Sequence, residues 1–324
     1  MGRLDTRVCV ITGGGRGIGA AIARTLAAQG AKIVVNDLGA SLEGEGEDQA
    51  PASQVVEEIR SAGGQAISNF GDITDYDQAE ALIQSALDEF GGLDVMINVA
   101  GILRDRMIFN MAEHEWDDVI RVHMKGTFNT TRFASIHWRS ERKGHYRLIN
   151  FTSVSGLYGA PGQPNYAAAK MGIVGFTLSC ANALQRYGVT ANAISPGAHT
   201  RMIDSIPGDR RRAGSTDQPP EDPERSPNNI AIPVAYLASE ASDWLSGRVI
   251  GSRGYEIELI SNPQPEALIV GDEPWDIEAA AEEIERVFRP IVEYDGHAAA
   301  HQALAAGAGV EQRYPRPYAH PQDG

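Results

Sequence analysis

Short apolar segments alternate with amphipathic segments from residue 7 to about residue 258 of the chain. The segments 7–12 and 32–36 are rich in Val and Ile, which is typical of buried strands. Between them, in 20–29, apolar residues recur at helical spacing. By the same criteria we predict further strands at 65–70, 93–100, 147–153, 189–195 and 248–252. We predict further helices at 53–62, 77–90, 115–138, 165–187 and 228–239.

This alternation restricts the chain to one class of fold. A helix between consecutive strands acts as a crossover connection, so the strands it joins are parallel. Right-handed crossovers place helices on both faces of such a sheet. The sequence therefore predicts the α/β class, with a doubly wound Rossmann sheet of about seven parallel strands.

Two segments depart from the alternation. Residues 203–228 are polar and rich in proline, and a loop of that length inside a compact domain is usually functional, so we interpret it as a substrate loop. Residues 262–324 follow the last predicted strand and contain one amphipathic helix at about 276–288. We therefore predict a domain at 1–261 and a C-terminal extension at 262–324.

Charge and composition narrow the choice of partners. The 324 residues include 43 acidic and 28 basic side chains, a formal net charge of −15, and this field disfavours nucleic acid as a partner. No apolar run reaches the ~18–20 residues of a membrane span, and no leader precedes the first strand, so we expect a cytoplasmic protein with no membrane partner. Cys9 and Cys180 lie in apolar segments and are expected to be small core residues in a reducing compartment.

A glycine-rich turn joins the first predicted strand to the first helix. Thr12 to Gly19 read T-G-x-x-x-G-x-G, and glycines let backbone N–H groups approach a pyrophosphate at the positive end of a helix. A tight turn with no ligand is the alternative interpretation. The pattern indicates a dinucleotide cofactor, with these candidate binding residues: Gly13, Arg16, Gly17, Ile18 and Gly19.

Asp37 ends the second predicted strand, where a carboxylate can accept hydrogen bonds from the adenosine ribose. Its charge would repel a 2′-phosphate, which favours NAD over NADP, although Arg16 could partly offset the repulsion. A turn cap is the alternative role for Asp37. Further cofactor candidates follow the third and fourth strands: Asp72 and Ile73 for the adenine, and Asn98, Ala100 and Gly101 where the cofactor would lie close to the backbone.

Tyr166 and Lys170 are four positions apart on a predicted helix, so their side chains share one face. Tyrosine has an ordinary pKa near ~10, and a cation within ~4–6 Å can lower such a pKa by about 1–3 units. Tyr166 could then accept the proton of an alcohol, or donate one to a ketone. Ser153 would hold the substrate oxygen, and Lys170 could also bind the nicotinamide ribose. A surface Tyr/Lys pair is the alternative interpretation.

In order and spacing, Thr12–Gly19, Asn98–Gly101, Ser153, Tyr166 with Lys170, and Pro196–Gly197 resemble the short-chain dehydrogenase/reductase family. The resemblance covers about residues 4–258. It implies a homotetramer or homodimer, and it implies that Ser153, Tyr166 and Lys170 have the roles just described. It also implies that Pro196, Gly197 and Thr200 flank the nicotinamide.

Within that family, residues 35–39, 100–106 and 121–123 look like the (3R)-hydroxyacyl-CoA dehydrogenase unit of multifunctional β-oxidation enzymes and related bacterial stand-alone enzymes. The family usually has an Asn that completes a catalytic tetrad, and the matching position here is His123, as in that branch. A purely structural histidine is the alternative. The chain departs from the branch because it lacks the hydratase and carrier domains and a peroxisomal signal, and because its substrate loop is polar.

These observations predict an NAD-dependent oxidoreductase that interconverts a secondary alcohol and a ketone, with a 3-hydroxyacyl thioester as substrate. A steroid or cyclic alcohol is the alternative substrate, and a catalytically silent NAD-binding regulatory protein is the alternative of another class. Arg210–Arg212 in the substrate loop could meet the phosphates of a CoA or carrier thioester, or could be a solvated run. His297 and His301 have no third ligand nearby in sequence, so we expect no metal site.

Overall fold

The computed structural model describes residues 2–41, 43–197 and 223–294. Contacts divide the chain into two compact units, Met1–Asn262 and Pro263–Gly324, which are described separately below. The predicted substrate loop at 203–228 lies outside the described residues up to position 222, and the described part contains the short helical turn Pro223–Arg225.

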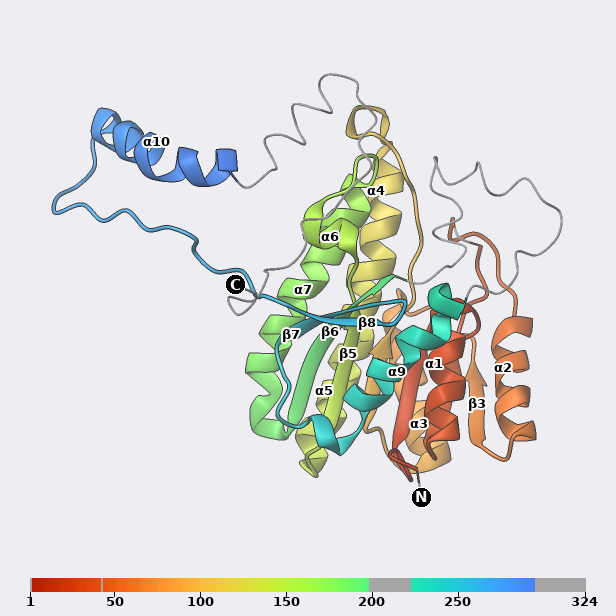
Figure 1. Ribbon diagram of the computed structural model, residues 1–324. Coiled ribbons are helices and arrows are strands. Elements are labelled where there is room, and N and C mark those ends of the chain that lie inside the picture. Colours follow the sequence, from red (N-terminus) through yellow and green to blue (C-terminus); the bar gives the residue numbers. More distant parts are fainter. Residues whose placement is uncertain (1, 42, 198–222, 295–324) are drawn as a thin grey trace. The chain divides into compact units, whose positions relative to one another are not determined.

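The first unit is built on one sheet of eight strands in the order β3-β2-β1-β4-β5-β6-β7-β8 (Figure 1). The strands are β1 (Val8–Thr12), β2 (Lys32–Asn36), β3 (Gln65–Asn69), β4 (Val95–Asn98), β5 (Tyr146–Phe151), β6 (Val189–Gly197), β7 (Arg248–Arg253) and β8 (Glu256–Ile260). The first seven are parallel, as the sequence predicts, and β8 pairs antiparallel to β7. The doubly wound α/β fold is therefore confirmed.

The eighth strand was not predicted from the sequence. A tight turn at Gly254, whose φ is +55°, reverses the chain and returns it along β7. The side chains of Ile257 and Leu259 on β8 are 63% and 60% exposed. Because β8 is an edge strand with little burial, it lacks the apolar run that identifies the central strands.

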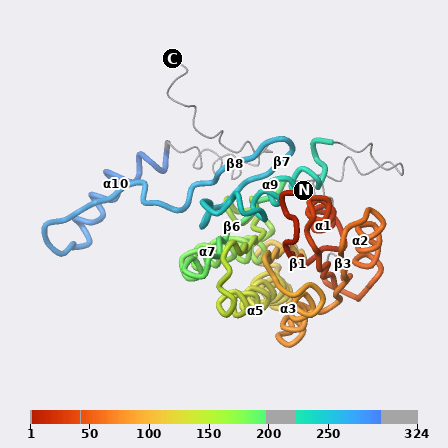
Figure 2. The backbone as a smooth tube through the Cα atoms, turned by 90° about the horizontal axis from the view of Figure 1, so that it is seen from below, coloured from red at the N-terminus to blue at the C-terminus, as the bar shows by residue number. Residues whose placement is uncertain are grey.

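Helices cover both faces of the sheet. The helices of the first unit are α1 (Gly17–Ala28), α2 (Ala50–Ser61), α3 (Tyr76–Phe90), α4 (Glu113–Ile120), α5 (Gly126–Glu141), α6 (Val154–Tyr158), α7 (Pro164–Leu184) and α9 (Pro227–Ala238). Seen from below, α1 and α9 lie on one side of the sheet and α3, α5 and α7 on the other (Figure 2). The short α6 was not predicted, since five residues are too few to show a helical period.

The side chains of β1 explain how one strand serves both layers. Alternate residues of a strand point to opposite faces. Cys9 and Ile11 pack in the hydrophobic cluster formed with α1, α2 and α9, whereas Val8 and Val10 pack in the cluster formed with α3, α5 and α7. All five residues of β1 are buried, as expected for a central strand of a parallel sheet.

The long helix predicted at 115–138 is interrupted by one π-helical turn. Its regular parts are α4 and α5, and Arg121–Lys125 between them form the π-helix. One-turn π-bulges inside α-helices often occur at functional sites. This one buries His123, which is 1% exposed.

By length and composition alone, one helix among the described residues could cross a membrane, which differs from our expectation that no apolar run is long enough. It spans Pro164–Tyr187, that is α7 and the turn that follows it. In the fold this helix packs on β6 and α6 and buries the polar side chains of Asn165, Lys170 and Thr177. It is therefore a core helix of the first unit, and one that carries two of the predicted catalytic residues.

The second unit contains the helix α10 (Ile277–Tyr294). It begins where Asp276 accepts a hydrogen bond from the backbone N–H of Ala279 at 2.9 Å. It continues beyond the predicted end, through Pro290. Trp275, Ile284 and Phe288 line a small apolar pocket of about 250 Å³ within this unit.

Candidate active site

The direction of chain winding reverses between β1 and β4, and ligands of doubly wound sheets bind outside the carboxyl ends of the strands at such a point. The glycine turn lies there. Gly13 has a φ of +64°, and a Cβ on it would lie 2.9 Å from the backbone of Ala100. A Cβ on Gly19 would lie 2.0 Å from the carbonyl oxygen of Gly13. Both positions therefore require glycine, which keeps the turn close to the neighbouring strand.

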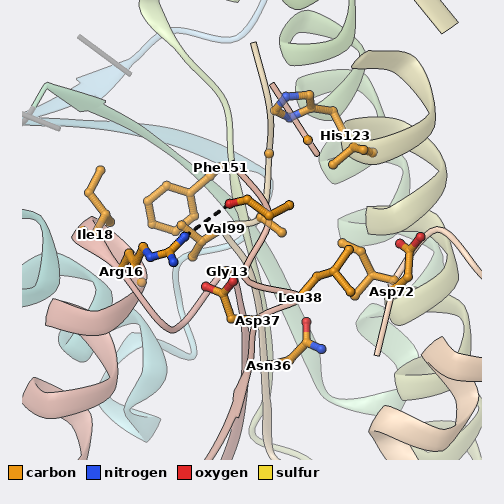
Figure 3. Close-up of a pocket in the computed structure, with 18 of the residues that line it drawn as sticks. Gly13, Arg16, Ile18, Asn36, Asp37, Leu38, Asp72, Val99, His123 and Phe151 are labelled. Atoms are coloured by element: carbon orange, nitrogen blue, oxygen red, sulfur yellow. Dashed lines mark hydrogen bonds between the residues drawn. The ribbon is translucent and has the colours of Figure 1, made fainter. Parts of the chain in front are cut away.

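A pocket of about 300 Å³ opens at this point (Figure 3). Its lining includes most of the residues predicted from the sequence: Gly13, Arg16, Gly17, Ile18, Gly19, Asp37, Asp72, Ile73, Ala100, Gly101, His123, Tyr166, Lys170 and Pro196. Asn98, Ser153 and Gly197 are not part of this lining. Thr200, Arg210–Arg212, His297 and His301 lie outside the described residues. The structure thus brings most of the predicted cofactor-binding residues, and three of the four predicted catalytic residues, to one cavity.

The carboxylate of Asp37 orders the turn around the pocket. One oxygen accepts a hydrogen bond from the backbone N–H of Gly15 at 2.8 Å, and the other accepts from Gly39 at 2.7 Å. Asp37 also lines the pocket, so it has both the cap role and the position that the sequence suggested for reading the ribose. Nearby, the guanidinium of Arg16 donates to the carbonyl oxygens of Gly39 and Ala40 at 3.4 and 3.2 Å.

Asp72 is held within its own turn, whereas Asn98 is held by side chains from other elements. Asp72 accepts hydrogen bonds from the backbone N–H and the hydroxyl of Thr74 at 2.8 and 2.9 Å, and it stays at the pocket wall. Asn98 is buried, donates to Asn150 at 2.9 Å and accepts from Thr130 at 2.7 Å. In this structure its side chain therefore links β4 to β5 and α5, outside the pocket lining.

Tyr166 and Lys170 come from successive turns of α7, as the helical spacing requires. The Lys170 Nζ lies 5.5 Å from the centre of the Tyr166 ring and donates a hydrogen bond to the carbonyl oxygen of Phe151 at 2.8 Å. Ser153 caps the N-terminus of α6, where it accepts a hydrogen bond from Ser155 at 3.2 Å. Residues of β5 and α7 therefore line the pocket together, and Ser153 lies outside the lining at the N-terminus of α6.

Burial governs the acidity of both catalytic groups. It raises the pKa of Tyr166 to about 12. The charge of Asp105 adds to this rise, and the hydrogen bond with Ser153 opposes it. Burial also lowers the pKa of Lys170 to about 7. In this structure burial is the largest influence on the pKa of Tyr166, and Lys170 is directed to the carbonyl oxygen of Phe151. The lowering of that pKa by two cations, Lys170 and an oxidised nicotinamide, stays a prediction for the site with its cofactor.

His123 is fixed beside Tyr166 by the π-helical turn. The two rings meet edge to face at 5.2 Å between their centres. His123 Nε2 lies 2.9 Å from the carbonyl oxygen of Ile102, while Nδ1 is buried with no hydrogen-bond partner among the described residues. Burial, and then the charge of Lys170, hold the pKa of His123 well below its usual value, so the imidazole is neutral. Nε2 also lies 3.2 Å from the backbone N–H of Ile102, so it can donate to the carbonyl oxygen or accept from the N–H, and Nδ1 is then the acceptor or the donor of the ring.

Gly101 makes room for this histidine. A Cβ on Gly101 would lie 2.1 Å from His123 Cε1, far closer than any allowed contact. We expect Gly101→Ala to displace the imidazole or the strand end, with a loss of about 1–3 kcal/mol in unfolding free energy and a clear loss of turnover. Chemical unfolding and a turnover assay measure both effects.

Gly92→Ala is the matched control, because a Cβ there meets nothing within 4 Å. We expect it to change the unfolding free energy by less than about 0.5 kcal/mol. Equal stability and turnover for the two variants would contradict the close contact between Gly101 and His123.

A hydrogen-bonded chain next to the catalytic serine was not found from the sequence. Ser155 Oγ donates to Gln163 at 2.8 Å, and Gln163 donates to Asp105 at 2.9 Å. Burial raises the pKa of Asp105. These three residues lie in separate loops and helix ends and share no motif spacing, so only the folded chain shows their connection.

Comparison with known proteins agrees with this geometry. The sequence model of the family described as short chain dehydrogenase matches residues 7–210. The chain is 42% identical to hydroxyacyl-CoA dehydrogenase ChsB1 of Mycobacterium tuberculosis, over 84% of this chain and 86% of that protein. It is 41% identical to peroxisomal multifunctional enzyme type 2 of Mus musculus, over 63% of this chain but only 27% of that larger protein.

A solved structure of a short chain dehydrogenase from Mycobacterium avium has the same fold. It superimposes with a TM-score of 0.76 at 39% sequence identity and covers 89% of this chain and 96% of that one. The similarity therefore extends over the sheet and its helices as well as over the motifs.

Proposed function

We propose that this chain, which belongs to the short-chain dehydrogenase family and is an oxidoreductase acting on CH–OH groups, uses NAD to interconvert a 3-hydroxyacyl thioester and its 3-oxo counterpart. The observation that carries the chemistry is the meeting of Tyr166, Lys170 and His123 at the wall of the dinucleotide pocket, with Ser153 hydrogen bonded to Tyr166. A bound nicotinamide supplies the hydride acceptor or donor.

Side chains of the protein would transfer the proton and orient the substrate oxygen. Tyr166 is protonated at neutral pH because its pKa is about 12, so its hydroxyl is ready to donate a proton to the oxygen of a ketone during reduction. In the oxidative direction the same oxygen must accept the alcohol proton, and the positive charge of an oxidised nicotinamide would stabilise the phenolate. Ser153 would orient the substrate oxygen by a second hydrogen bond.

We assign His123 to proton transfer through its free Nδ1. Nδ1 is buried without a hydrogen-bond partner among the described residues, on a residue that lines the pocket together with Tyr166 and Lys170 and packs edge to face against the Tyr166 ring. A neutral imidazole can hold a water molecule there without adding charge beside Lys170. This assignment supports a relay of protons away from Lys170, in the place where the family usually has an asparagine.

The thioester substrate is supported by the names of two relatives, a hydroxyacyl-CoA dehydrogenase and a multifunctional peroxisomal enzyme. A panel of (3R)-hydroxyacyl-CoA esters compared with steroid and cyclic alcohols tests this choice. Higher kcat/KM on the thioesters is the expected result.

The preference for NAD is supported by the Asp37 carboxylate at the end of β2 in the pocket wall. We expect Asp37→Ala to raise the ratio of kcat/KM with NADP to that with NAD by roughly tenfold, because repulsion of the 2′-phosphate is lost. Steady-state kinetics with both cofactors measure the ratio. Asp77→Ala, a change of an exposed carboxylate on α3, serves as the control. An unchanged ratio in Asp37→Ala would show that this carboxylate does not read the ribose.

Two further expectations are also proposals. We propose a homodimer or homotetramer, which is supported by exposed apolar side chains on α5 and α7: Phe128, Ile136 and Met171 are 44%, 47% and 40% exposed. Sedimentation of the full chain tests it.

We propose a cytoplasmic location, which imaging of the tagged protein in its own cell tests.

A further inference from the structure

Arg16 and Asp48 form an ion pair at the rim of the cofactor pocket. Their side chains meet at 3.2 Å and are 31% and 52% exposed. Arg16 belongs to the glycine turn, whereas Asp48 comes from the segment between β2 and α2. Together with the carbonyl oxygens of Gly39 and Ala40, Asp48 gives the guanidinium three partners on that segment. Figure 3 labels Arg16 and Asp37 in the pocket and marks a hydrogen bond of the Arg16 guanidinium with a dashed line.

The fold itself returns Asp48 to this place. The backbone N–H of Asp48 donates to the carbonyl oxygen of Leu38 at 3.1 Å, which closes the segment on itself. A Cβ on Gly39 would lie 1.8 Å from the carbonyl oxygen of Asp48, so only glycine allows this approach. The second carboxylate oxygen of Asp48 accepts from the backbone N–H of Ala50 at 3.0 Å, at the start of α2. Asp48 is therefore anchored next to the end of β2.

The ion pair leaves the pocket without an available cation near Asp37. Among the described lining residues the basic groups besides Arg16 and His123 are Arg121 and Lys170. Arg121 donates to Thr74 and Asp118, and Lys170 donates to Phe151. A 2′-phosphate is doubly charged and needs a guanidinium or ammonium to balance it. Arg16 is the residue best placed to supply that cation, but its guanidinium is paired with Asp48.

We propose that Asp48 is a specificity-determining residue for the cofactor. It holds Arg16 against the carbonyl oxygens of Gly39 and Ala40, so that the guanidinium does not turn to a ribose 2′-phosphate and Asp37 acts without a counter-charge. This inference rests on the proposed preference for NAD, and it adds a second residue to the one that the strand end provides.

The test measures binding of two adenosine fragments to the full chain by calorimetry: 5′-ADP and adenosine 2′,5′-bisphosphate. Asp48→Asn removes the charge but retains an oxygen for the N–H of Ala50. We expect it to raise the affinity for the bisphosphate relative to 5′-ADP by roughly three- to tenfold, within the range of one exposed ion pair and one removed charge. Glu47→Gln, which removes an exposed charge next to Asp48, should change the ratio by less than twofold.

A second pair of variants isolates the role of Arg16. In an Arg16→Ala background, Asp48→Asn should raise the ratio by less than twofold, as Glu47→Gln does, because no guanidinium is left to be released and only the removed negative charge acts. An unchanged ratio in Asp48→Asn, or the full three- to tenfold gain without Arg16, would overturn the inference. A wild-type chain that prefers the bisphosphate would instead contradict the proposed NAD preference, so the two failures are distinguishable.

Discussion

Tyr166→Phe is expected to lower turnover by about 10²- to 10⁴-fold, which is the usual contribution of a positioned acid or base. The change removes the oxygen that passes the proton and leaves the ring. Tyr166 is 9% exposed and is packed edge to face against His123, and a phenylalanine retains that contact. We therefore expect the affinity for NAD to stay within about threefold while the chemical step is lost.

Nicotinamide absorbance measures turnover, and quenching of protein fluorescence measures NAD affinity. Tyr255→Phe is the control, since Tyr255 is 73% exposed in the turn between β7 and β8. Its turnover should match that of the wild type. Normal turnover in Tyr166→Phe would remove Tyr166 from the mechanism.

Lys170→Met is expected to produce the largest change in stability, and the change depends on pH. Burial lowers the pKa of Lys170 from 10.5 to about 7 in the folded chain. Below pH 7 both the folded and the unfolded chain carry this proton, and burying the charge destabilises the fold by roughly 5 kcal/mol. Between pH 7 and 10.5 only the unfolded chain binds the proton, so the unfolding free energy of the wild type rises with pH.

Methionine fills the same space without a charge. The substitution also removes the hydrogen bond that Lys170 donates to the carbonyl oxygen of Phe151. This loss should lower the unfolding free energy by about 1–3 kcal/mol. At about pH 6 we expect the variant to be more stable than the wild type by a few kcal/mol, and this advantage should shrink or reverse by about pH 10. Groups that do not interact with Lys170 are common to both proteins and cancel in the difference. His123 does not cancel fully, because the charge of Lys170 is the second cause of its lowered pKa, after burial.

Denaturant unfolding across this pH range checks the prediction. Lys125→Met is the matched control, because Lys125 is exposed on the π-helical turn and its loss removes no buried charge. Its difference from the wild type should be flat with pH. A flat difference for Lys170→Met as well would contradict a buried, destabilised ammonium.

Most of the fold could be predicted because the buried strands are recognisable in the sequence from their composition. The central strands are covered on both faces, so they appear as continuous apolar runs such as Val8–Thr12. The elements that were missed are those without such a run. β8 is an exposed edge strand, α6 has five residues, and the π-helical turn at Arg121–Lys125 depends on packing around His123.

The parts of the site that consist of residues close together in the sequence could be predicted. Tyr166 and Lys170 share a helix face, and the glycine turn links a strand to a helix, so both patterns are visible in sequence. Contacts between distant segments are not visible. The ion pair between Arg16 and Asp48 and the space that Gly101 leaves for His123 required the folded chain. The burial that raises the pKa of Tyr166 was not visible in the sequence either, since burial is a property of the whole fold.

The most direct test of the account is nicotinamide absorbance during turnover, with NAD and NADP in parallel and a (3R)-hydroxyacyl-CoA as substrate. We predict rapid formation of NADH, slower reaction with NADP, and loss of both in Tyr166→Phe. Turnover of steroid or cyclic alcohols alone would retain the mechanism and reject the thioester. Binding of NAD with no turnover of any alcohol would contradict the central claim that this site transfers hydride.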